Sequence, residues 1–539
     1  MEDVFWADQI AAQAIERAKK EGNIVTCRSA ASTSGAKHIG NIFDVAKSYI
    51  VHKAVLKKGF ESRFVLTHDD RDPLRAIPDR VPDLEGKWHS ISEKKFEQWL
   101  GHPYVNVPDP FGCCTSWADH FAKVWESGIC SAGITDVKVF STDKLYRKGV
   151  FDPYVLKALE KIGLVQELMQ KFQETKTENY IPFDAVCGKC GKITTVAVDF
   201  DLKKKRISYE CSGKELAGKY KIDGCGHTGT AGFRDGKLPW SFEWPAQWAI
   251  FKTTFGPFGK EHAEGSWPRC SAIMREIYGK EPPIPHIYEF LLINGEKMSA
   301  RRGNAYIAQE MVRIVEPEVF LYFYTKRSKK QRDLDLVHIE HMVNDFEHAE
   351  RVYFGIDKEK NEQDKINLMR MYESSMDKIP KKMPLRVPYQ FAALISQIHN
   401  PEEGIERAIS LLKSTGHVRS LTKKDRQYIR KRLFCAKNWA ESFAPEEMKI
   451  VLHETNVKLS EQESKALSSL LKILTKKINE PELQNQIYEI AKSSGMDPKD
   501  FFRIIYRILT GRDSGPRLGP FIISIGEKKV AMLLKKAVQ

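Results

Sequence analysis

Short apolar runs and one helical stripe alternate along the first part of the chain. Residues 23–29 and 62–67 are apolar enough to be buried strands, and between them apolar side chains recur at helical spacing over residues 41–58. A strand, a turn, a helix and a second strand in this order predict the start of a doubly wound α/β domain. Ligands of such domains bind beyond the carboxyl ends of the strands. Residues 68–72, which contain three aspartates, are expected at such an end.

The pattern changes character three times further along. Residues 117–175 predict mainly helices, residues 180–232 combine cysteines and glycines with short β-prone runs, and α/β content returns over 237–310. From about residue 311 onward, strand signals fade and amphipathic helices follow one another. We therefore predict an α/β fold class: a Rossmann-type doubly wound domain with an inserted cysteine-rich module, followed by an all-α C-terminal half. The predicted domains are residues 1–115 and 237–310 (the two halves of the Rossmann domain), 116–236 (a helical insertion with the module at about 180–232), 311–375 (a helical connecting domain) and 376–539 (an all-helical C-terminal domain).

Composition and charge exclude some classes of protein and favour one kind of partner. The 539 residues suffice for about three or four domains, and an apolar content of 42% argues against wholesale disorder. No apolar run reaches the about 18 residues of a membrane span, and the acidic N-terminus lacks the order of a signal peptide. Lysine and arginine outnumber aspartate and glutamate by 85 to 71, which gives a net charge of +14. That excess favours a polyanionic partner such as nucleic acid, with a merely basic surface as the alternative.

Four of the ten cysteines form a pattern typical of a metal site. Cys187 and Cys190 make a C-x2-C knuckle, and Cys211 and Cys225 follow at irregular spacing, with His227 as a rival for the fourth place. Tetrahedral Zn²⁺ takes four such thiolate or imidazole ligands, and four closed ligands leave no position for chemistry. We therefore predict a structural zinc site, against the alternative of a metal-free thiol cluster. The other six cysteines are scattered, which indicates a reducing, cytoplasmic location.

A first candidate phosphate site is the string Ser34-Gly-Ala-Lys-His-Ile-Gly-Asn41, which follows the first predicted strand and opens the first predicted helix. N–H groups at a helix N-terminus attract anions. His38 and Asn41 can donate hydrogen bonds to phosphates, and Gly40 lets a base approach the backbone closely. The alternative is an ordinary helix entry in which His38 merely packs.

A second candidate lies about 260 residues later, in the string Lys297-Met-Ser-Ala-Arg-Arg-Gly303. Lys297 supplies a point charge, Ser299 a small donor and Arg301 a planar fork, which together suit a flexible clamp over phosphates. The alternative is a solvated basic loop. The two strings become specific because they occur in this order, in an α/β context, with a helical tail behind. Together they predict an enzyme that activates its substrate with ATP.

The pair of strings resembles the two signature motifs of class I aminoacyl-tRNA synthetases, usually written HIGH and KMSKS. Further strings resemble the class I lysyl-tRNA synthetases and span nearly the whole chain in the family's order: residues 68–75, 103–112, 238–248, 259–262, 316–322 and 514–521. The chain departs from the family pattern at Asn41, where the second histidine of the motif stands, and at Ala30 and Ser32, where glycine and threonine are usual. Arg301 takes the place of the second lysine in the second motif.

The resemblance implies a reaction in two steps. The carboxylate of L-lysine attacks the α-phosphate of ATP, giving lysyl-adenylate and pyrophosphate. The 2′-hydroxyl of the 3′-terminal adenosine of tRNA-Lys then takes the lysyl group, and AMP is released. Neither step needs a protein nucleophile, so catalysis is expected from positioning and charge stabilisation. Mg²⁺ is implied with ATP, a cytoplasmic monomer is expected, and residues 376–539 are implied to bind the anticodon.

The resemblance also implies roles for single residues. The implied catalytic residues are His38, Gly40, Asn41, Lys297, Ser299 and Arg301, and ATP is expected to contact Ser34, Gly35, His38, Gly40, Asn41, Lys297, Met298 and Ser299. Lysine carries an α-ammonium and an ε-ammonium group joined by an aliphatic stem. Its pocket therefore needs hydrogen-bond acceptors and an apolar wall. The implied lysine-binding residues are Ala30, Ser32, Asp69, Asp70, Trp240, His262 and Tyr288. Plain core packing is the alternative for the tryptophan, and helix capping is the alternative for the two aspartates.

Three other functions compete with a lysine ligase. A class I ligase for glutamate would present arginine to the side-chain carboxylate, and Arg71 and Arg75 keep that alternative open. A cysteine ligase would need a zinc ion near the first motif, for which Cys27 alone is a poor candidate. A tRNA-binding paralogue without activity is opposed by the intact residues of both motifs.

Overall fold

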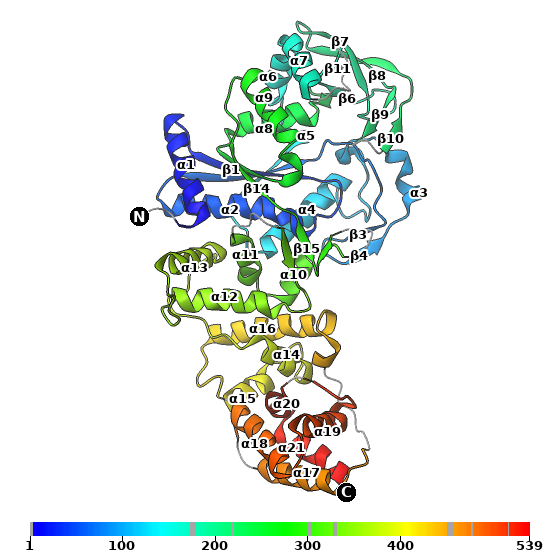
Figure 1. Ribbon diagram of the computed structural model, residues 1–539. Coiled ribbons are helices and arrows are strands. Elements are labelled where there is room, and N and C mark those ends of the chain that lie inside the picture. Colours follow the sequence, from blue (N-terminus) through cyan, green and yellow to red (C-terminus); the bar gives the residue numbers. More distant parts are fainter. Residues whose placement is uncertain are drawn as a thin grey trace. The chain divides into compact units, whose positions relative to one another are not determined.

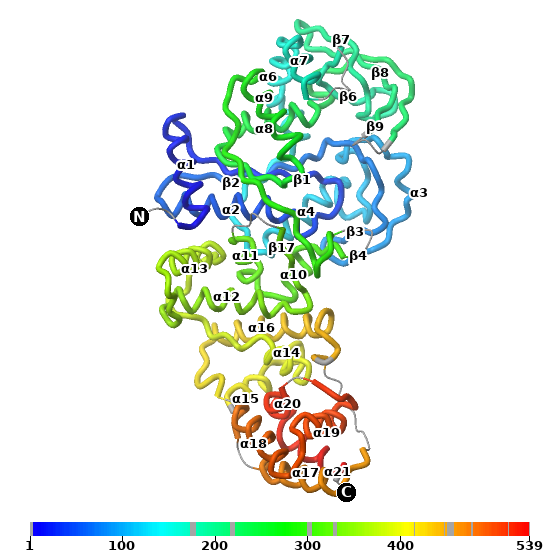
Figure 2. The backbone as a smooth tube through the Cα atoms, viewed as in Figure 1, coloured from blue at the N-terminus to red at the C-terminus, as the bar shows by residue number. Residues whose placement is uncertain are grey.

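The computed structural model describes residues 4–172, 179–216, 220–298, 304–326, 331–414, 416–449, 457–475, 478–515 and 517–538 (Figure 1; Figure 2). The chain divides into two compact units. Unit 1 comprises Met1–Glu310, Phe320–Leu334 and Lys358–Ile379, and unit 2 comprises Met311–Val319, Asp335–Asp357 and Pro380–Gln539. Among the helices of the described ranges, none has the length and apolar character needed to cross a membrane.

A five-stranded parallel sheet forms the centre of unit 1, with the strand order β14-β13-β1-β2-β5. The strands are β1 (Val25–Ser32), β2 (Ser62–Asp69), β5 (Val137–Ser141), β13 (Phe255–Gly259) and β14 (Ile284–Tyr288). From β1 the chain builds outward to β2 and β5, and it later returns to add β13 and β14 on the other side of β1. The direction of building therefore reverses between β1 and β13, which is the switch point where doubly wound sheets bind ligands.

The strands β1 and β2 are largely buried because helices cover both faces of the sheet. Helix α2 (Ile42–Lys57) lies on one face and α8 (Trp240–Phe251) on the other (Figure 1). The parallel register pairs Ser32 with Asp69, so the two strands end level with each other. The strands and the helix that the hydrophobic pattern predicts for the first 70 residues form there, and the α/β, doubly wound fold class is confirmed.

The insertion lies between β5 and β13. It begins with α5 (Thr142–Arg147), α6 (Asp152–Glu160) and α7 (Ile162–Phe172) and continues with short strands: β6 (Asp184–Ala185), β7 (Val196–Asp201), β8 (Arg206–Glu210), β9 (Gly213–Leu216), β10 (Tyr220–Asp223), β11 (Thr228–Gly232) and β12 (Gly236–Lys237). Strands β7, β8 and β11 form an antiparallel sheet, and β9 pairs with β10.

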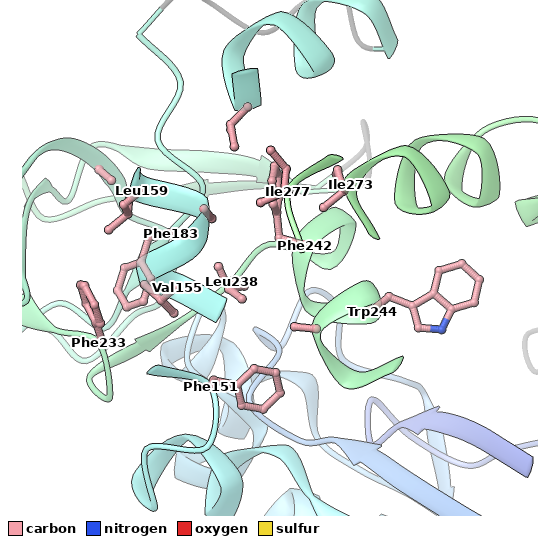
Figure 3. Close-up of a cluster of buried hydrophobic side chains, with 14 of the residues drawn as sticks. Phe151, Val155, Leu159, Phe183, Phe233, Leu238, Phe242, Trp244, Ile273 and Ile277 are labelled. Atoms are coloured by element: carbon pink, nitrogen blue, oxygen red, sulfur yellow. The ribbon is translucent and has the colours of Figure 1, made fainter. Parts of the chain in front are cut away.

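One hydrophobic core joins the insertion to α8 and to α9 (Ser266–Glu276). Phe183, Leu238 and Phe242 are fully or almost fully buried in it. Figure 3 shows the indole of Trp244 projecting from α8 away from these three side chains. Trp244 belongs to the same core, which therefore fixes α8 against the insertion.

A small sheet carries the second phosphate motif. Strands β15 (Leu291–Ile293) and β16 (Glu296–Lys297) form a hairpin, and β17 (Arg332–Leu334) runs parallel to β15. The two turn residues, Asn294 and Gly295, have φ angles of 49° and 79°, as a tight hairpin turn requires. The hairpin thus gives Lys297 a defined place at its end.

The described part of unit 2 is helical, as predicted for the C-terminal half. Its helices are α12 (Glu340–Tyr353), α14 (Tyr389–Ile398), α15 (Glu406–Ser414), α16 (Lys423–Ser442), α17 (Glu461–Ile473), α18 (Glu480–Ser493), α19 (Pro498–Thr510), α20 (Leu518–Ile525) and α21 (Glu527–Val538). Helices α17 to α21 share one apolar core. The remaining helices of the chain are α1 (Trp6–Lys20), α3 (Glu93–Phe96), α4 (Trp117–Ser131), α10 (Ala308–Ile314), α11 (Pro317–Thr325) and α13 (Glu362–Ser375).

Candidate active site

The first motif forms a tight entry into α2. Ile39–Asn41 make one short 3-10 helix, and α2 follows directly. The backbone N–H of Gly40 donates to Nδ1 of His38 over 3.1 Å, and the N–H of His38 donates to Oδ1 of Asn41 over 3.1 Å. Because Nδ1 of His38 accepts a hydrogen bond, the proton of the neutral ring is on Nε2. His38 therefore presents an N–H donor at Nε2.

Electrostatics keep the His38 ring neutral. Burial, and to a lesser degree the neighbouring Lys37, lowers the pKa of His38 to about 4. Burial also lowers the pKa of Lys37 to about 8, although Asp69 and Asp72 oppose that effect. At neutral pH the motif thus offers an uncharged imidazole donor beside an ammonium group, and both suit a phosphate.

The two motifs meet at Gly40. A Cβ atom at this position would lie 2.9 Å from the ring of His38 and 2.8 Å from Cε of Met298. Contacts this short do not occur in packed proteins, so a larger residue at this position would force the Met298 side chain and the His38 ring to shift. Met298 belongs to the second motif, and strings about 260 residues apart in the sequence are therefore in contact.

The second motif is described as far as Met298. Lys297 ends β16 with an exposed side chain, and its Nζ atom lies 4.6 Å from the ring centroid of Phe290. Ser299 and Arg301, which the sequence predicts to act on phosphates, lie outside the described residues.

A cavity of about 630 Å³ opens beside His38. Its lining includes Ser34, Gly35 and His38 of the first motif, the cations Arg75 and Arg80, and the side chains Trp88, Tyr306 and Ile307. The other described residues predicted to contact ATP, which are Gly40, Asn41, Lys297 and Met298, are not in this lining. A cavity with apolar walls and two arginines in its lining suits a nucleotide.

A second cavity, of about 500 Å³, lies at the switch point beyond β1, β2, β13 and β14. It is lined by Ala30, Ser32, Asp69, Trp240, His262 and Tyr288, which are six of the seven predicted lysine-binding residues. Trp240 and Trp244 stack in its wall with ring centroids 5.0 Å apart. Both cavities have the size of small-molecule sites, about 300–1,000 Å³. Arg75 lines both, so the two cavities share one wall.

Asp70 is the seventh predicted lysine-binding residue, and it has another position. Its Oδ1 atom accepts hydrogen bonds from Oγ1 of Thr142 over 2.9 Å and from the N–H of Asp143 over 2.8 Å. These donors belong to the first turn of α5. The carboxylate therefore caps a helix, which is the alternative that the sequence left open, and Asp70 is absent from the lining of the cavity.

Polar groups behind the second cavity form a connected network. Oδ1 of Asp69 accepts from Nε2 of Gln247 over 2.9 Å. Asp72 pairs with the buried Lys237, whose Nζ atom also donates to Glu243 over 2.6 Å. Burial raises the pKa of Glu243 to about 8, although Lys237 opposes the shift. Asp69 thus lines the cavity, and the hydrogen bond from Gln247 holds its carboxylate in place.

Sequence analysis missed two charged residues of this cavity, Arg28 on β1 and Asp44 in the first turn of α2. A carboxylate near a helix N-terminus is ordinarily explained by the helix dipole, which hides any other role. One signal in the sequence could have indicated another role for Asp44: it stands among apolar residues in the first turn of α2. The neighbouring residues Ile42, Phe43 and Val45 are buried.

The four predicted cysteines gather in the insertion. The sulfur atoms of Cys187, Cys190, Cys211 and Cys225 all lie within 4.8 Å of one another, and His227 is not part of the cluster. The Cys187–Cys225 and Cys190–Cys211 sulfur distances are both 3.7 Å. Sulfurs bound to tetrahedral Zn²⁺ at about 2.3 Å are about 3.8 Å apart, so this donor set fits the ion.

A second cluster of metal-ligating side chains precedes α4, and sequence analysis missed it. Ligand atoms of Asp109, Cys113, Cys114 and His120 lie within 4.8 Å of one another. Nδ1 of His120 is 3.4 Å from Sγ of Cys113 and 3.2 Å from Oδ1 of Asp109. Nε2 of His120 lies 2.9 Å from the carbonyl of Pro82, an arrangement that leaves Nδ1 free to bind a metal. Two thiols, one imidazole and one carboxylate also suit Zn²⁺.

Comparisons with known proteins agree with this architecture. A family model described as tRNA synthetases class I (K) matches residues 4–378. The protein named lysine–tRNA ligase of Natronomonas pharaonis is 36% identical over 99% of this chain and 97% of its own length. That of Halobacterium salinarum is 33% identical over 99% and 97%, and that of Pyrococcus furiosus is 32% identical over 99% of each.

Among solved structures, a glutamate tRNA ligase from Elizabethkingia meningosepticum is similar at 13% identity, with a TM-score of 0.41 over 95% of this chain and 99% of that one. A likeness at this level carries no argument about substrate. The family model covers well over half of the chain, and the relatives match it nearly end to end. The chain therefore belongs to the class I lysyl-tRNA synthetase family.

Proposed function

We propose that this chain is a lysine–tRNA ligase. It activates L-lysine with ATP to lysyl-adenylate and pyrophosphate, then transfers the lysyl group to the 2′-hydroxyl of the 3′-terminal adenosine of tRNA-Lys and releases AMP. The observation that carries the proposal is the contact of the two phosphate motifs at Gly40 and Met298, beside two cavities that share the wall at Arg75. One cavity is open to a nucleotide, and the other has acidic and aromatic walls.

In the first step the chain's own residues position the reactants. His38 donates from Nε2 to a phosphate oxygen, and Lys37 supplies positive charge beside it. Lys297 is at the end of the β15–β16 hairpin, and its proposed role, together with Ser299 and Arg301, is to stabilise the leaving pyrophosphate. Mg²⁺ accompanies ATP and adds positive charge, held mostly by phosphates and water. The lysine carboxylate is then the nucleophile, and orientation lowers the barrier.

The walls of the second cavity favour lysine over the substrates of related ligases. Asp69 faces the cavity and accepts an ammonium group, while the stacked Trp240 and Trp244 cover an aliphatic stem. A glutamate ligase remains the main alternative, because Arg28 and Arg75 also line this cavity. A cysteine ligase and a tRNA-binding paralogue without activity are the other two alternatives.

Zn²⁺ is proposed to have a structural role here. The four cysteines of the insertion would hold one ion in a closed tetrahedral site, and the cluster around His120 would hold another. Neither cluster shares a residue with the two cavities that would bind substrates. Cys187 lines a separate hollow of about 630 Å³.

The polyanionic partner is proposed to be tRNA-Lys. The net charge of +14 supports it, and residues 376–539, which are helical where described, are proposed to contact the anticodon. We further propose a monomer that works in the cytoplasm. The predicted domain boundaries remain part of this proposal.

An ATP–pyrophosphate exchange assay tests the proposed function. The assay is run with a tRNA-Lys transcript present, because some synthetases of this class activate their amino acid only with tRNA bound, and with lysine, glutamate, cysteine or no amino acid. Exchange that depends on lysine alone is expected. Exchange that depends on glutamate or cysteine, or that never occurs, contradicts the proposal.

A further inference from the structure

Arg75 is placed between the two cavities proposed for the substrates. In the described part of the chain it is the one residue that lines both the cavity beside His38 and the second cavity. Activation requires the carboxylate of the amino acid and the α-phosphate of ATP to approach within about 3–3.5 Å. With one substrate in each cavity, these groups meet at the shared wall. A side chain that borders both cavities is therefore within reach of both reacting groups.

The backbone next to Arg75 is held by pairing with a second segment. The N–H of Leu74 donates to the carbonyl of His102 over 2.8 Å. The N–H of Tyr104 donates to the carbonyl of Asp72 over 3.0 Å. The segment after β2 is thus tied to the chain around Tyr104 on both sides of Arg75's neighbour, and this limits the places that the arginine side chain can reach.

The phenol of Tyr104 orients the Arg75 side chain. Tyr104 is almost fully buried and lines the cavity beside His38 together with Arg75. Burial and the charge of Asp72 raise the pKa of Tyr104 to about 12, while the charge of Arg75 and a side-chain hydrogen bond with it oppose that shift. The phenol is therefore uncharged at neutral pH. It holds the guanidinium group without cancelling its positive charge.

The charge of Arg75 is not used in an ion pair. Arg75 makes no salt bridge within the part of the chain that the structure describes, and Asp72 pairs instead with the buried Lys237. By contrast, Arg71, from the same segment, pairs with Asp143 over 2.7 Å. A guanidinium group with unused donors, at a wall between two anionic substrates, is suited to bind both.

We propose that Arg75 is a catalytic residue of the activation step, whose guanidinium group bridges the α-carboxylate of lysine and a non-bridging oxygen of the α-phosphate. The inference rests on the proposed function and deepens it. In this step a carboxylate oxygen forms a bond to the α-phosphorus, and the bond from that phosphorus to the oxygen shared with the β-phosphate breaks. Its electron pair leaves with pyrophosphate, and no proton is transferred. The five N–H donors of one planar fork suffice for both anions.

Two effects of this bridge lower the barrier. The carboxylate and the triphosphate repel each other, and a cation between them offsets that repulsion where little water screens it. The planar fork also fixes the direction from which the carboxylate approaches. The same role explains why Arg75 lines a cavity proposed for lysine: it faces the α-carboxylate, which every amino acid carries, and so it does not favour a glutamate side chain.

The test uses Arg75→Ala in the full-length chain, with a tRNA-Lys transcript present. Lysine-dependent ATP–pyrophosphate exchange gives kcat and both KM values, and lysinol, which lacks the carboxylate, is measured as a competitive inhibitor. We expect kcat to fall about 100- to 1,000-fold, as for the loss of one donor to the charge that develops in the transition state. KM for lysine and for ATP should each change less than about fivefold, and the inhibition constant of lysinol less than about twofold.

Three further variants separate catalysis from folding. Arg275→Ala is the matched control, because Arg275 is exposed on α9, pairs with the exposed Glu281 and lines neither cavity; it should leave all constants unchanged. Arg75→Lys keeps a point charge without the fork and should recover about 10-fold of the lost kcat at most. Tyr104→Phe leaves the guanidinium charge in place and should lower kcat only about 5- to 10-fold, with both KM values unchanged.

Chemical rescue gives a readout that a merely structural role would not move. Guanidinium chloride at millimolar concentration should restore part of the kcat of Arg75→Ala, because the free ion can enter the space that the side chain leaves. It should not raise the kcat of Tyr104→Phe, in which Arg75 still occupies that space. The melting temperatures of all variants are measured beside the rates.

Three results would overturn the inference. The first is a kcat of Arg75→Ala within about threefold of that of the unaltered chain. The second is a rise in KM for one substrate that accounts for the whole loss, which would make Arg75 an ordinary binding group for that substrate. The third is a parallel loss of lysinol binding and melting temperature without rescue. If the unaltered chain fails to activate lysine at all, the proposed function itself is wrong, and that outcome is distinct from these three.

Discussion

At the scale of single residues, close packing between the two motifs constrains the geometry of the site more than their charge does. Gly40 is enclosed by the ring of His38 on one side and by Met298 on the other. The charged ends of the motifs can adjust by rotating about side-chain bonds, whereas this contact involves a backbone position that cannot move without displacing α2.

Gly40→Ala should therefore impair activation. The added methyl must displace the His38 ring or Met298 by about 1 Å, and a misplacement of that size costs about 100-fold in rate. Lysine-dependent exchange measures it, with Gly163→Ala in α7 as the control, since a Cβ there meets nothing within 4 Å. Equal rates for the two variants would show that the motifs separate in the working enzyme.

His38 also predicts a pH dependence of stability. Its pKa is about 4 in the folded chain and about 6.5 in the unfolded one, so the unfolded state binds the extra proton first as pH falls. The stabilisation is present above pH 6.5 and is lost as the pH falls to about 4, by at most about 3 kcal/mol. The melting temperature should fall less steeply between pH 6.5 and 4.5 in His38→Asn than in the unaltered chain. Parallel curves would contradict the low pKa.

At the scale of elements, two clusters of metal-ligating side chains link segments that are separate in the sequence. The cysteine cluster ties together the knuckle at Cys187 and the segments that flank β9 and β10. The cluster around His120 ties the loop from Asp109 to the first turn of α4. A metal ion bound at either cluster would cross-link these segments.

Metal analysis of cysteine variants tests both clusters. The purified chain should hold about two zinc equivalents, and Cys187→Ser and Cys113→Ser should each release about one and lower the melting temperature. Cys130→Ser is the matched control, because Cys130 is an exposed free thiol outside both clusters. A chain with no metal would remove both assignments, and a single equivalent lost only in Cys187→Ser would remove the second.

A buried ion network organises the helices of unit 2. On α16, Arg432 donates to Glu316 over 2.6 Å, to Glu347 over 2.7 Å and to the carbonyl of Val387 over 2.9 Å. Both glutamates need this partner, because an unpaired buried charge is strongly destabilising. One arginine thus joins three segments that are distant in the sequence.

Arg432→Ala should destabilise unit 2 by about 3–5 kcal/mol, because it leaves two carboxylates without their cation. Urea unfolding followed by circular dichroism measures the loss. Arg430→Ala, at an exposed position of the same helix, should change stability by less than about 0.5 kcal/mol. Similar losses in the two variants would mean that the network contributes nothing beyond helix propensity.

At the scale of the whole molecule, we attribute the excess of basic residues to binding of a polyanionic partner and not to stabilisation of the fold. The 14 lysines and arginines in excess of the acidic count are not needed to hold either core; the net charge of +14 is a property of the surface as a whole. Raising the salt concentration from 50 to 200 mM should therefore weaken binding of tRNA by about 10-fold or more. A filter-binding titration measures it, and salt-independent affinity would contradict a phosphate-dominated contact.

Family membership, the doubly wound sheet and the helical C-terminal half followed from the sequence alone, and the comparisons and the structure confirm them. They could be predicted because motifs such as Ser34–Asn41 are contiguous strings, and because hydrophobic periodicity reports local structure directly. The roles of the site residues stay predictions. The second cluster was missed because Asp109 and His120 meet only when a loop closes onto α4.

Asp69 and Asp70 illustrate what only the tertiary structure decided. The sequence determined that acidic side chains follow β2, but neighbouring residues at a strand end point in opposite directions, so one alone can face the cavity. Which one does so depends on where α5 and α8 pack against the sheet, and that packing is set by residues far away in the chain. The sequence thus determined the kinds of chemical group available, while the fold decided which of them face the substrate cavity.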